Sequence, residues 1–299
     1  MIAFSFQDVV IKLLSEDTSL FQILFVRSMI GIFLISAFLK ISGKPIKWGT
    51  AYPVMSTLRG LLFFFGYSTF YFAQSKIPIA NATVLFLVSP FFITILSIFI
   101  FGSQVGINRW ITMIIGFSGV IIIAQPEVGM FDVFYLLPVA VALTYAISMM
   151  IAKKTSEHDT VYQQIIFMYI VTAVLSAVMG LSIGDGRFDT YEFVAIEFMV
   201  RSWNFDTINI TLSLIAVAAI GTIAFLLLTT AYRVSDPASI APFEYSGLLV
   251  TIVAGYLFWG DVLSLKEIVG MVLIVGSGIY LFYRENVKGV QEATETPLR

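Results

Sequence analysis

The chain has 299 residues, of which 59% are hydrophobic, 15% aromatic and only 12% charged, and its mean hydropathy is +0.94. Soluble domains average about 25% charged residues, so this composition indicates an integral membrane protein, with the lipid bilayer as a partner. A net charge of −2 offers no basic stripe for nucleic acid, and the lack of cysteine excludes disulfides, thiolate metal sites and cysteine nucleophiles. With a single histidine as well, we expect neither a metal nor a cofactor.

Apolar runs of about 20 residues, bounded by charge, glycine or proline, predict ten membrane-spanning helices. In chain order they lie at 2–14, 20–41, 52–74, 79–101, 108–124, 130–152, 161–183, 209–231, 237–259 and 264–283. The first run would cover only about 20 Å at 1.5 Å per residue, against a hydrocarbon core of about 30 Å. It is therefore a partial span, or a longer helix whose beginning lies before the recorded start. No basic region or small-residue cleavage site marks it as a signal peptide, so we expect it to be retained.

An even number of spans places both termini on one side of the membrane. With cytoplasmic termini, ten of the 17 basic residues fall in inner segments and four in outer segments. The positive-inside rule therefore favours cytoplasmic termini in an inner, or plasma, membrane. The four tryptophans lie near predicted span ends or in connections, where aromatic belts form: Trp48, Trp110, Trp203 and Trp259.

One connection, residues 184–208, is much longer than the others and too polar to cross the bilayer. Its middle part, YEFVAIEFMV at 191–200, fits a helix lying in the membrane interface. A solvated external loop explains the same residues equally well, and both interpretations stay open.

The chain contains a weak internal repeat. Pro78 and Pro237 align at an offset of 159 residues, and GFSGVIII at 116–123 matches VGSGIYLF at 275–282 at nearly the same offset. Because each copy holds five spans, an odd number, the two copies enter the membrane in opposite senses, which is typical of secondary transporters. We expect an all-α polytopic protein with one five-helix repeat at 1–126, an inverted second repeat at 127–286, and a cytoplasmic tail at 287–299.

Several strings together resemble the drug/metabolite transporter superfamily, in the branch with two EamA domains. They are FQILFVRSMIG at 21–31, LRGLLFFFGYSTFYFA at 58–73, IPIANATVLFLVSPFF at 77–92, GFSGVIII at 116–123, ALTYA at 142–146, SDPASIAPFEYSGLL at 235–249 and GYLFWGD at 255–261. The resemblance covers essentially the whole chain. It implies ten helices, cytoplasmic termini, a central cavity between the halves, and alternating-access transport of a small organic solute.

The chain departs from the family pattern in three places. Ser103 follows the glycine that ends the fourth span, whereas the second half keeps the acidic Asp261 after its corresponding glycine. The connection 184–208 is longer than usual, and the first helix is short, which weakens any role for Asp8.

Ionisable side chains inside spans are expensive in hydrocarbon and therefore point to function. Asp8 and Lys12 lie four residues apart and can pair on one helical face, although a structural pair or a snorkelling lysine explains them too. Arg27 lies about 10 Å from the outer end of its span, where it can snorkel or bind a substrate carboxylate. Arg59 lies at a similar depth from the inner side, where it can bind substrate, take part in gating, or form a salt bridge, for example with Glu244.

Glu244 is the one carboxylate clearly within an intact predicted span. A carboxylate placed between desolvation and a neighbouring arginine can exchange a proton, which proton coupling requires. A fixed ion pair between the halves is the alternative.

Pro90 and Pro242 interrupt the fourth and ninth spans, and corresponding interrupted helices in two halves point to a transporter binding site. The two prolines are not at the same repeat position, because Pro90 lies 12 residues after Pro78 and Pro242 five after Pro237. A packing kink explains a membrane proline equally well. Other polar side chains at membrane depth are candidate substrate contacts, although such groups commonly bond a neighbouring helix: Asn81, Ser89, Tyr67, Tyr145 and Tyr245.

These observations predict a permease that moves a small organic metabolite as its two halves rock around a midplane cavity. A cavity with both an arginine and a carboxylate suits zwitterions, so an amino acid or its derivative is the first expectation. S-adenosylmethionine, which the resemblance includes among possible substrates, is the alternative, and protons are the expected coupling ion. A membrane enzyme acting on lipid would need a nucleophile, base or metal cluster that the spans do not supply, and a scaffold or receptor would not need buried charges. The sequence allows a monomer or a homodimer.

Overall fold

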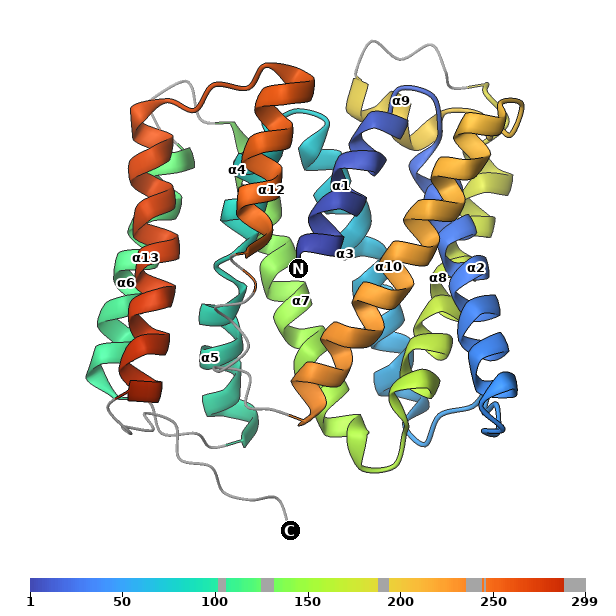
Figure 1. The fold of residues 1–299 in the computed structure, drawn as a ribbon, viewed down its shortest axis with the longest axis horizontal. Helices are drawn as coiled ribbons and strands as arrows, with labels where there is room; N and C mark the ends of the chain where they lie inside the picture. The colour runs from blue at the N-terminus through green and yellow to red at the C-terminus, as the bar shows by residue number, and fades with distance from the viewer. Residues whose placement is uncertain (102–105, 125–131, 188–193, 235–243, 245, 288–299) are drawn as a thin grey trace. The chain divides into compact units, whose positions relative to one another are not determined.

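The computed structural model describes residues 1–101, 106–124, 132–187, 194–234, 244 and 246–287, and every element within them is helical (Figure 1). The α-helices are α1 (Ile2–Leu14), α2 (Leu20–Ile41), α3 (Pro53–Gln74), α4 (Ile79–Phe86), α5 (Ser89–Phe101), α6 (Ile107–Ala124), α7 (Leu136–Lys154), α8 (Val161–Ile183), α9 (Val194–Val200), α10 (Ile208–Val234), α12 (Ser246–Ala254) and α13 (Leu265–Val287). Short 3-10 turns lie at Val133–Tyr135 and Thr155–Glu157, and a π-helix, η3, runs over Gly255–Trp259.

Five helical segments in the described residues are long and apolar enough to cross a membrane. They are Leu20–Ile41, Ile79–Ile100, Val133–Glu157, Val161–Ile183 and Ile208–Val234. Each of the ten predicted runs contains helix. The helices α3 and α13 are long but less apolar, because α3 carries Arg59 and many hydroxyl groups and α13 carries charges at both ends. The protein is therefore a multi-pass, all-helical membrane protein.

The chain forms two compact units that each combine residues from distant parts of the sequence. Unit 1 comprises 1–76 and 151–233, and unit 2 comprises 77–150 and 234–299, so the boundary falls inside α7. In unit 1, α8 packs against both α2 and α3, and α9 contacts α2 and α3. The interface between α2 and α8 is close at Gly31, because a Cβ there would overlap the ring of Tyr169.

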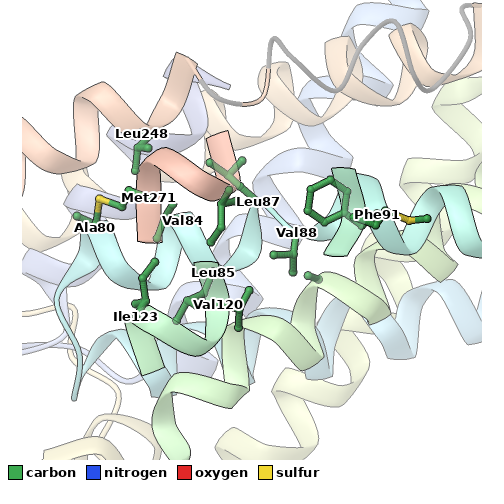
Figure 2. Packing of buried hydrophobic residues seen from close by; sticks show 13 residues of the cluster. Ala80, Val84, Leu85, Leu87, Val88, Phe91, Val120, Ile123, Leu248 and Met271 are labelled. Atoms are coloured by element: carbon green, nitrogen blue, oxygen red, sulfur yellow. The ribbon is translucent and has the colours of Figure 1, made fainter. Parts of the chain in front are cut away.

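Unit 2 is built around two helix pairs, α6 with α13 and α4 with α12. Small residues bring α6 and α13 together: a Cβ on Gly119 would lie 2.6 Å from the carbonyl oxygen of Gly270, and one on Gly270 would lie 2.8 Å from that of Gly119. Around α4 lies the apolar core of this unit, which includes Val84, Leu85 and, in α5, Phe91 (Figure 2).

The helix that begins at Ile79 is interrupted at Leu87 and Val88, so α4 and α5 are separate helices. Pro90 follows the interruption in the first turn of α5. Because proline has no N–H, it cannot donate to the carbonyl of Phe86, and the N–H of Phe91 bonds the carbonyl of Val88 at 2.9 Å. Leu87 and Val88 are both fully buried, so the interruption lies inside the apolar core (Figure 2).

A second irregular segment follows α12, where the chain widens into η3 and ends at Gly260. Gly260 has a φ of +69°, which glycine adopts without strain. The N–H of Asp261 bonds the carbonyl of Gly255 at 3.1 Å and closes this helix end. A π-helix is rare and frequently accompanies functional sites.

Candidate functional site

Arg27 lies in α2 and is only 1% exposed. Its Nη2 donates a hydrogen bond of 3.2 Å to the hydroxyl oxygen of Tyr67 in α3. The guanidinium carbon is 4.4 Å from the ring centre of Tyr67 and 5.3 Å from that of Phe63, so the cation also contacts two aromatic rings. Nε and Nη1 of Arg27 have no hydrogen-bond partner among the described residues. Two donors of a buried cation thus remain available in the described structure.

The side chain of Asp8 in α1 belongs to the same cluster. The hydroxyl of Tyr71 donates to Asp8 Oδ1 at 2.9 Å, and Nε2 of Gln7 donates to the Tyr71 oxygen at 3.1 Å. The positive charge of Arg27 also acts on Asp8. The absence of a side chain at Gly221 in α10 leaves space for Gln7 and Arg27, because a Cβ there would overlap Gln7 Oε1 and would lie 3.1 Å from Arg27 Nε.

Arg59 in α3 is 2% exposed and, like Arg27, lies beside an aromatic ring. Its Nη2 donates to Thr229 Oγ1 at 3.5 Å, and its guanidinium carbon is 5.8 Å from the ring centre of Phe225. The rings of Phe225 and Phe63 are 5.4 Å apart, edge to face. Because Phe63 also contacts Arg27, the rings of Phe63 and Phe225 lie between the two buried arginines, Arg27 and Arg59.

Glu244 is 1% exposed and belongs to unit 2. The hydroxyl of Tyr145 in α7 donates to Glu244 Oε1 at 2.9 Å, and the Tyr145 ring packs edge to face on Phe86 with 5.1 Å between the ring centres. Phe86 is the last residue of α4, directly before the helix interruption. The tyrosine therefore links the buried carboxylate to the interrupted helix.

The amide side chain of Asn81 in α4 bonds a carboxylate at the start of α13. Its Nδ2 donates to Glu267 Oε1, while Glu267 Oε2 accepts from the N–H of Ser264 at 2.7 Å at the start of α13. Oδ1 of Asn81 has no partner among the described residues. Ser89 is fully buried at the start of α5, and its hydroxyl also lacks a described partner.

The structure brings some of the predicted residues together and separates others. Asp8, Arg27 and Tyr67 share one cluster in unit 1, with Lys12 partly buried one helical turn beyond Asp8. Tyr145 and Glu244 form a pair in unit 2. Pairing of Arg59 with Glu244 would join residues of different units and stays a prediction.

Pro242 and Tyr245 lie outside the described residues. Gln7 and Phe225 are not among the residues predicted from the sequence. Tyr71 is a polar side chain at membrane depth, four residues after Tyr67 and therefore on the same helical face.

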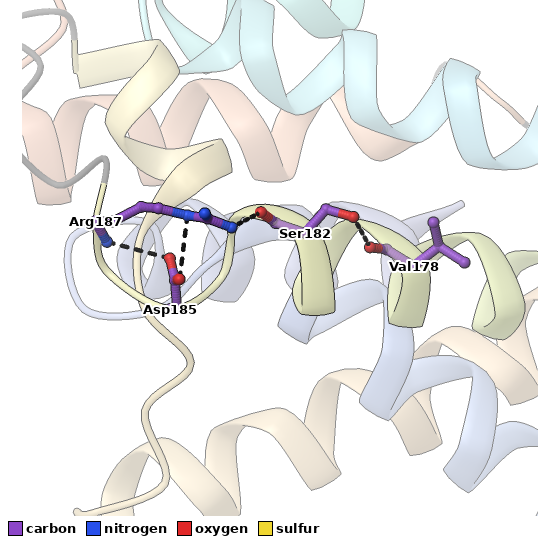
Figure 3. A network of polar contacts seen from close by, with 4 residues as sticks. All are labelled: Val178, Ser182, Asp185 and Arg187. Atoms are coloured by element: carbon purple, nitrogen blue, oxygen red, sulfur yellow. Dashed lines mark hydrogen bonds and ion pairs between the residues drawn. The ribbon is translucent and has the colours of Figure 1, made fainter.

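The buried contacts differ from the ion pair at the end of α8, which is exposed. Nε of Arg187 lies 3.1 Å from Asp185 Oδ2, with side-chain exposures of 56% and 52% (Figure 3). The same guanidinium donates to the carbonyl of Ser182. Water screens such a pair, so its contribution to stability is small.

A buried guanidinium with free donors can hold a carboxylate through charge-assisted hydrogen bonds, and neighbouring aromatic faces can hold a planar ring or a cation. The carboxylate of Glu244 can accept a proton or hold a positively charged group. These are binding and proton-exchange functions, and they need no bond to be made or broken in the solute.

The chain is similar to several transporters over most of its length. The chain is 24% identical over 95% of its length to an S-adenosylmethionine uptake transporter of Rickettsia prowazekii, covering 90% of that protein. It is 26% identical over 88% of its length to a riboflavin transporter of Vibrio cholerae, covering 74% of it. It is also 24% identical over 93% of its length to the pseudopaline exporter CntI of Pseudomonas aeruginosa, covering 91% of it.

One solved crystal structure superposes with a TM-score of 0.65 at 17% identity, covering 95% of this chain and 97% of that one. This likeness shows the fold alone. The EamA-like transporter family matches residues 1–125 and 133–284, which is nearly the whole chain. The chain therefore belongs to the EamA-like transporter family, within the drug/metabolite transporters.

Proposed function

We propose that this protein is a secondary transporter that carries an amino-acid derivative across the inner membrane by alternating access, with S-adenosylmethionine as the first solute to test. The observation that carries the proposal is Arg27, a buried cation with two donors that have no described partner, set against the rings of Tyr67 and Phe63. S-adenosylmethionine combines a carboxylate, an ammonium group, a sulfonium and an adenine ring. Its carboxylate suits Arg27, and its planar ring suits the aromatic faces.

The proposed topology has ten membrane helices in two inverted repeats, at 1–126 and 127–286, with both termini and the tail 287–299 in the cytoplasm. Helix pairing supports it. The pairs α2 with α8, α4 with α12, and α6 with α13 each join an element of the first repeat to its counterpart in the second. Inverted repeats related by a pseudo-two-fold axis produce such pairs.

Within this scheme the two units supply different chemistry. In unit 1, Arg27 binds the carboxylate of the solute, Arg59 supplies a second positive charge, and Tyr67 and Asp8 orient Arg27. In unit 2, Glu244 exchanges a proton for coupling, and Tyr145 orients its carboxylate. Further polar groups complete the proposed set: Lys12, Asn81, Ser89 and Tyr245, with helix breaks at Pro90 and Pro242.

The test is uptake of radiolabelled S-adenosylmethionine into proteoliposomes, with and without a pH gradient. We expect accumulation above that in protein-free vesicles, and competition by unlabelled S-adenosylmethionine. A panel of amino acids and riboflavin, added as competitors, separates the substrate classes that the relatives suggest. Folded protein that moves none of these solutes would remove the proposal, and chemical change of added lipid would favour an enzyme instead.

A further inference from the structure

One end of unit 1 is held by the connection between α8 and α10. The hydroxyl of Ser19 donates to the carbonyl of Met199 at 3.2 Å. Gln22 forms two bonds with the backbone of Asn204: Nε2 donates to the carbonyl at 2.6 Å and Oε1 accepts from the N–H at 2.8 Å. Ser19 and Gln22 are both fully buried. We call these contacts the outer clamp, following the orientation proposed above.

Arg201 adds a third connection to the outer clamp. Its Nη2 pairs with Glu197 at 2.6 Å, and its Nη1 donates to the carbonyl of Ser15 at 2.8 Å, directly after α1. Trp203 packs on the end of α8, where a Cβ on Gly180 would overlap its ring. Residues 194–204 therefore bond to the turn between α1 and α2 instead of forming a separate solvated loop.

At the opposite end of α2, a second set of contacts forms the inner clamp. Asp159, only 2% exposed, accepts from the N–H of Ala51 at 3.0 Å and from the hydroxyl of Thr50. The carbonyl of Asp159 accepts from Arg233 Nη1 at 2.9 Å. Nε2 of Gln163 donates to the carbonyl of Gly49 at 3.0 Å. The connection before α3 is thus bonded to the turn between α7 and α8.

Between the clamps, glycines interlock helices from the two halves of the sequence. Gly31 accommodates the fully buried ring of Tyr169, and a Cβ on Gly60 would lie 2.6 Å from Val171. In the reverse direction, Gly221 of the second half accommodates Gln7 of the first. Sliding the two sets of helices past one another would force these close-packed groups through each other.

We propose that unit 1 acts as one rigid block during transport, so that α1, α2 and α3 of the first half never separate from α8 and α10 of the second. The inference rests on the proposed function and refines the expectation that the two sequence halves rock against each other. Arg27, Arg59 and Asp8 all lie in this block. Their spacing then stays constant through the cycle, and the movement that alternates access does not run through the interfaces inside unit 1.

The chain has no cysteine, so covalent links can be placed on an otherwise unreactive protein. The outer pair is Gln22→Cys with Asn204→Cys. The inner pair is Gly49→Cys with Gln163→Cys, since nothing lies within 4 Å of a Cβ at Gly49. Each pair, and both together, are linked by oxidation of the two thiols to a disulfide, because the buried side-chain positions leave no room for a longer linker, and mass spectrometry verifies the link. The four single-cysteine variants, given the same oxidant, are the matched controls.

We expect the doubly linked protein to take up radiolabelled S-adenosylmethionine at an initial rate within about twofold of the unlinked double pair, because transport requires no movement across either clamp. Loss of uptake on linking, with uptake intact in the single-cysteine controls, would overturn the rigid block. Absence of uptake in all variants, including unlinked protein, would instead count against the proposed function.

In that second case hydrogen–deuterium exchange on the native protein decides the question without a solute. A rigid block predicts that the amides of residues 194–204 open together with those of α2 and α8. Their exchange protection factors should then differ from those of α2 and α8 by no more than about tenfold. Exchange of residues 198–204 at the rate of an unstructured peptide would overturn the proposal.

Discussion

The hydroxyl of Tyr145 donates a hydrogen bond of 2.9 Å to Oε1 of Glu244, although 99 residues separate them in the sequence. The bond lies in unit 2, beside the end of α4, and involves a carboxylate that is almost completely buried. Tyr145 is therefore one residue through which Glu244 can be perturbed without removing its charge.

The first prediction concerns that pair. Replacing Glu244 with Gln removes the charge and the exchangeable proton, and we expect uptake to lose its dependence on a pH gradient. Tyr145→Phe leaves the carboxylate in place, so uptake falls, by about tenfold or less, while the gradient still stimulates it. Initial uptake rates with and without the gradient measure both. Equal stimulation in Glu244→Gln and wild-type protein would contradict the coupling role.

A second prediction separates shape from charge at Arg27. Lysine keeps the positive charge but lacks the planar fork that contacts Tyr67 and Phe63. We expect Arg27→Lys to raise the half-saturating solute concentration about tenfold, which corresponds to about 1.4 kcal/mol. Saturation curves for uptake measure the change. Arg187→Lys is the matched control, because that arginine is exposed, and it should leave the curve unchanged (Figure 3).

The third prediction tests the close packing at Gly221. A methyl group there would overlap Gln7 Oε1, so Gly221→Ala is expected to destabilise the protein by about 1 to 3 kcal/mol. Gly276→Ala is the control, since nothing lies within 4 Å of a Cβ at that position, and alanine gains up to about 1 kcal/mol of helix propensity. Thermal unfolding in detergent compares them. A midpoint for Gly221→Ala at or above that of Gly276→Ala would refute the packing argument.

The fourth prediction concerns Asp159 in the inner clamp. The carboxylate accepts bonds from Thr50 and Ala51, and an amide side chain can replace only one of the two acceptor oxygens. We expect Asp159→Asn to cost about 1 to 3 kcal/mol of stability. Asp185→Asn removes an exposed carboxylate and should change stability by about 0 to 1 kcal/mol. Chemical unfolding curves of the two variants give the comparison.

The positions of the helices followed from hydropathy, because bilayer thickness fixes the length of an apolar run. Runs such as 161–183 therefore match α8 residue for residue. The packing of α2 on α8 did not follow, because it depends on the fit of the Tyr169 ring over Gly31, which no periodicity encodes. Hydropathy also left the 184–208 connection undecided, since hydrogen bonds to Ser19 and Gln22 hold its second part.

The polar cluster of unit 1 is only partly visible in the sequence. Arg27 and Asp8 stand out in the sequence because charge is rare in hydrocarbon. Gln7 does not, since neutral polar residues are common in membrane helices. Only the fold shows that Gln7 donates to the hydroxyl oxygen of Tyr71, and that this hydroxyl donates to Asp8. Phe63 and Phe225 look like any apolar residue until the helices bring them between two arginines.

The glycine interlocks also bear on how such a protein can be recombined. Gly31 fits Tyr169, and Gly221 fits Gln7, so each half carries both a notch and the side chain that fills a notch in the other. A chimera joining residues 1–126 of this chain to the second half of a relative keeps this fit only where the relative supplies a side chain that fills Gly31 and a glycine that accepts Gln7. The two halves of the sequence therefore have to be exchanged together with these matching residues.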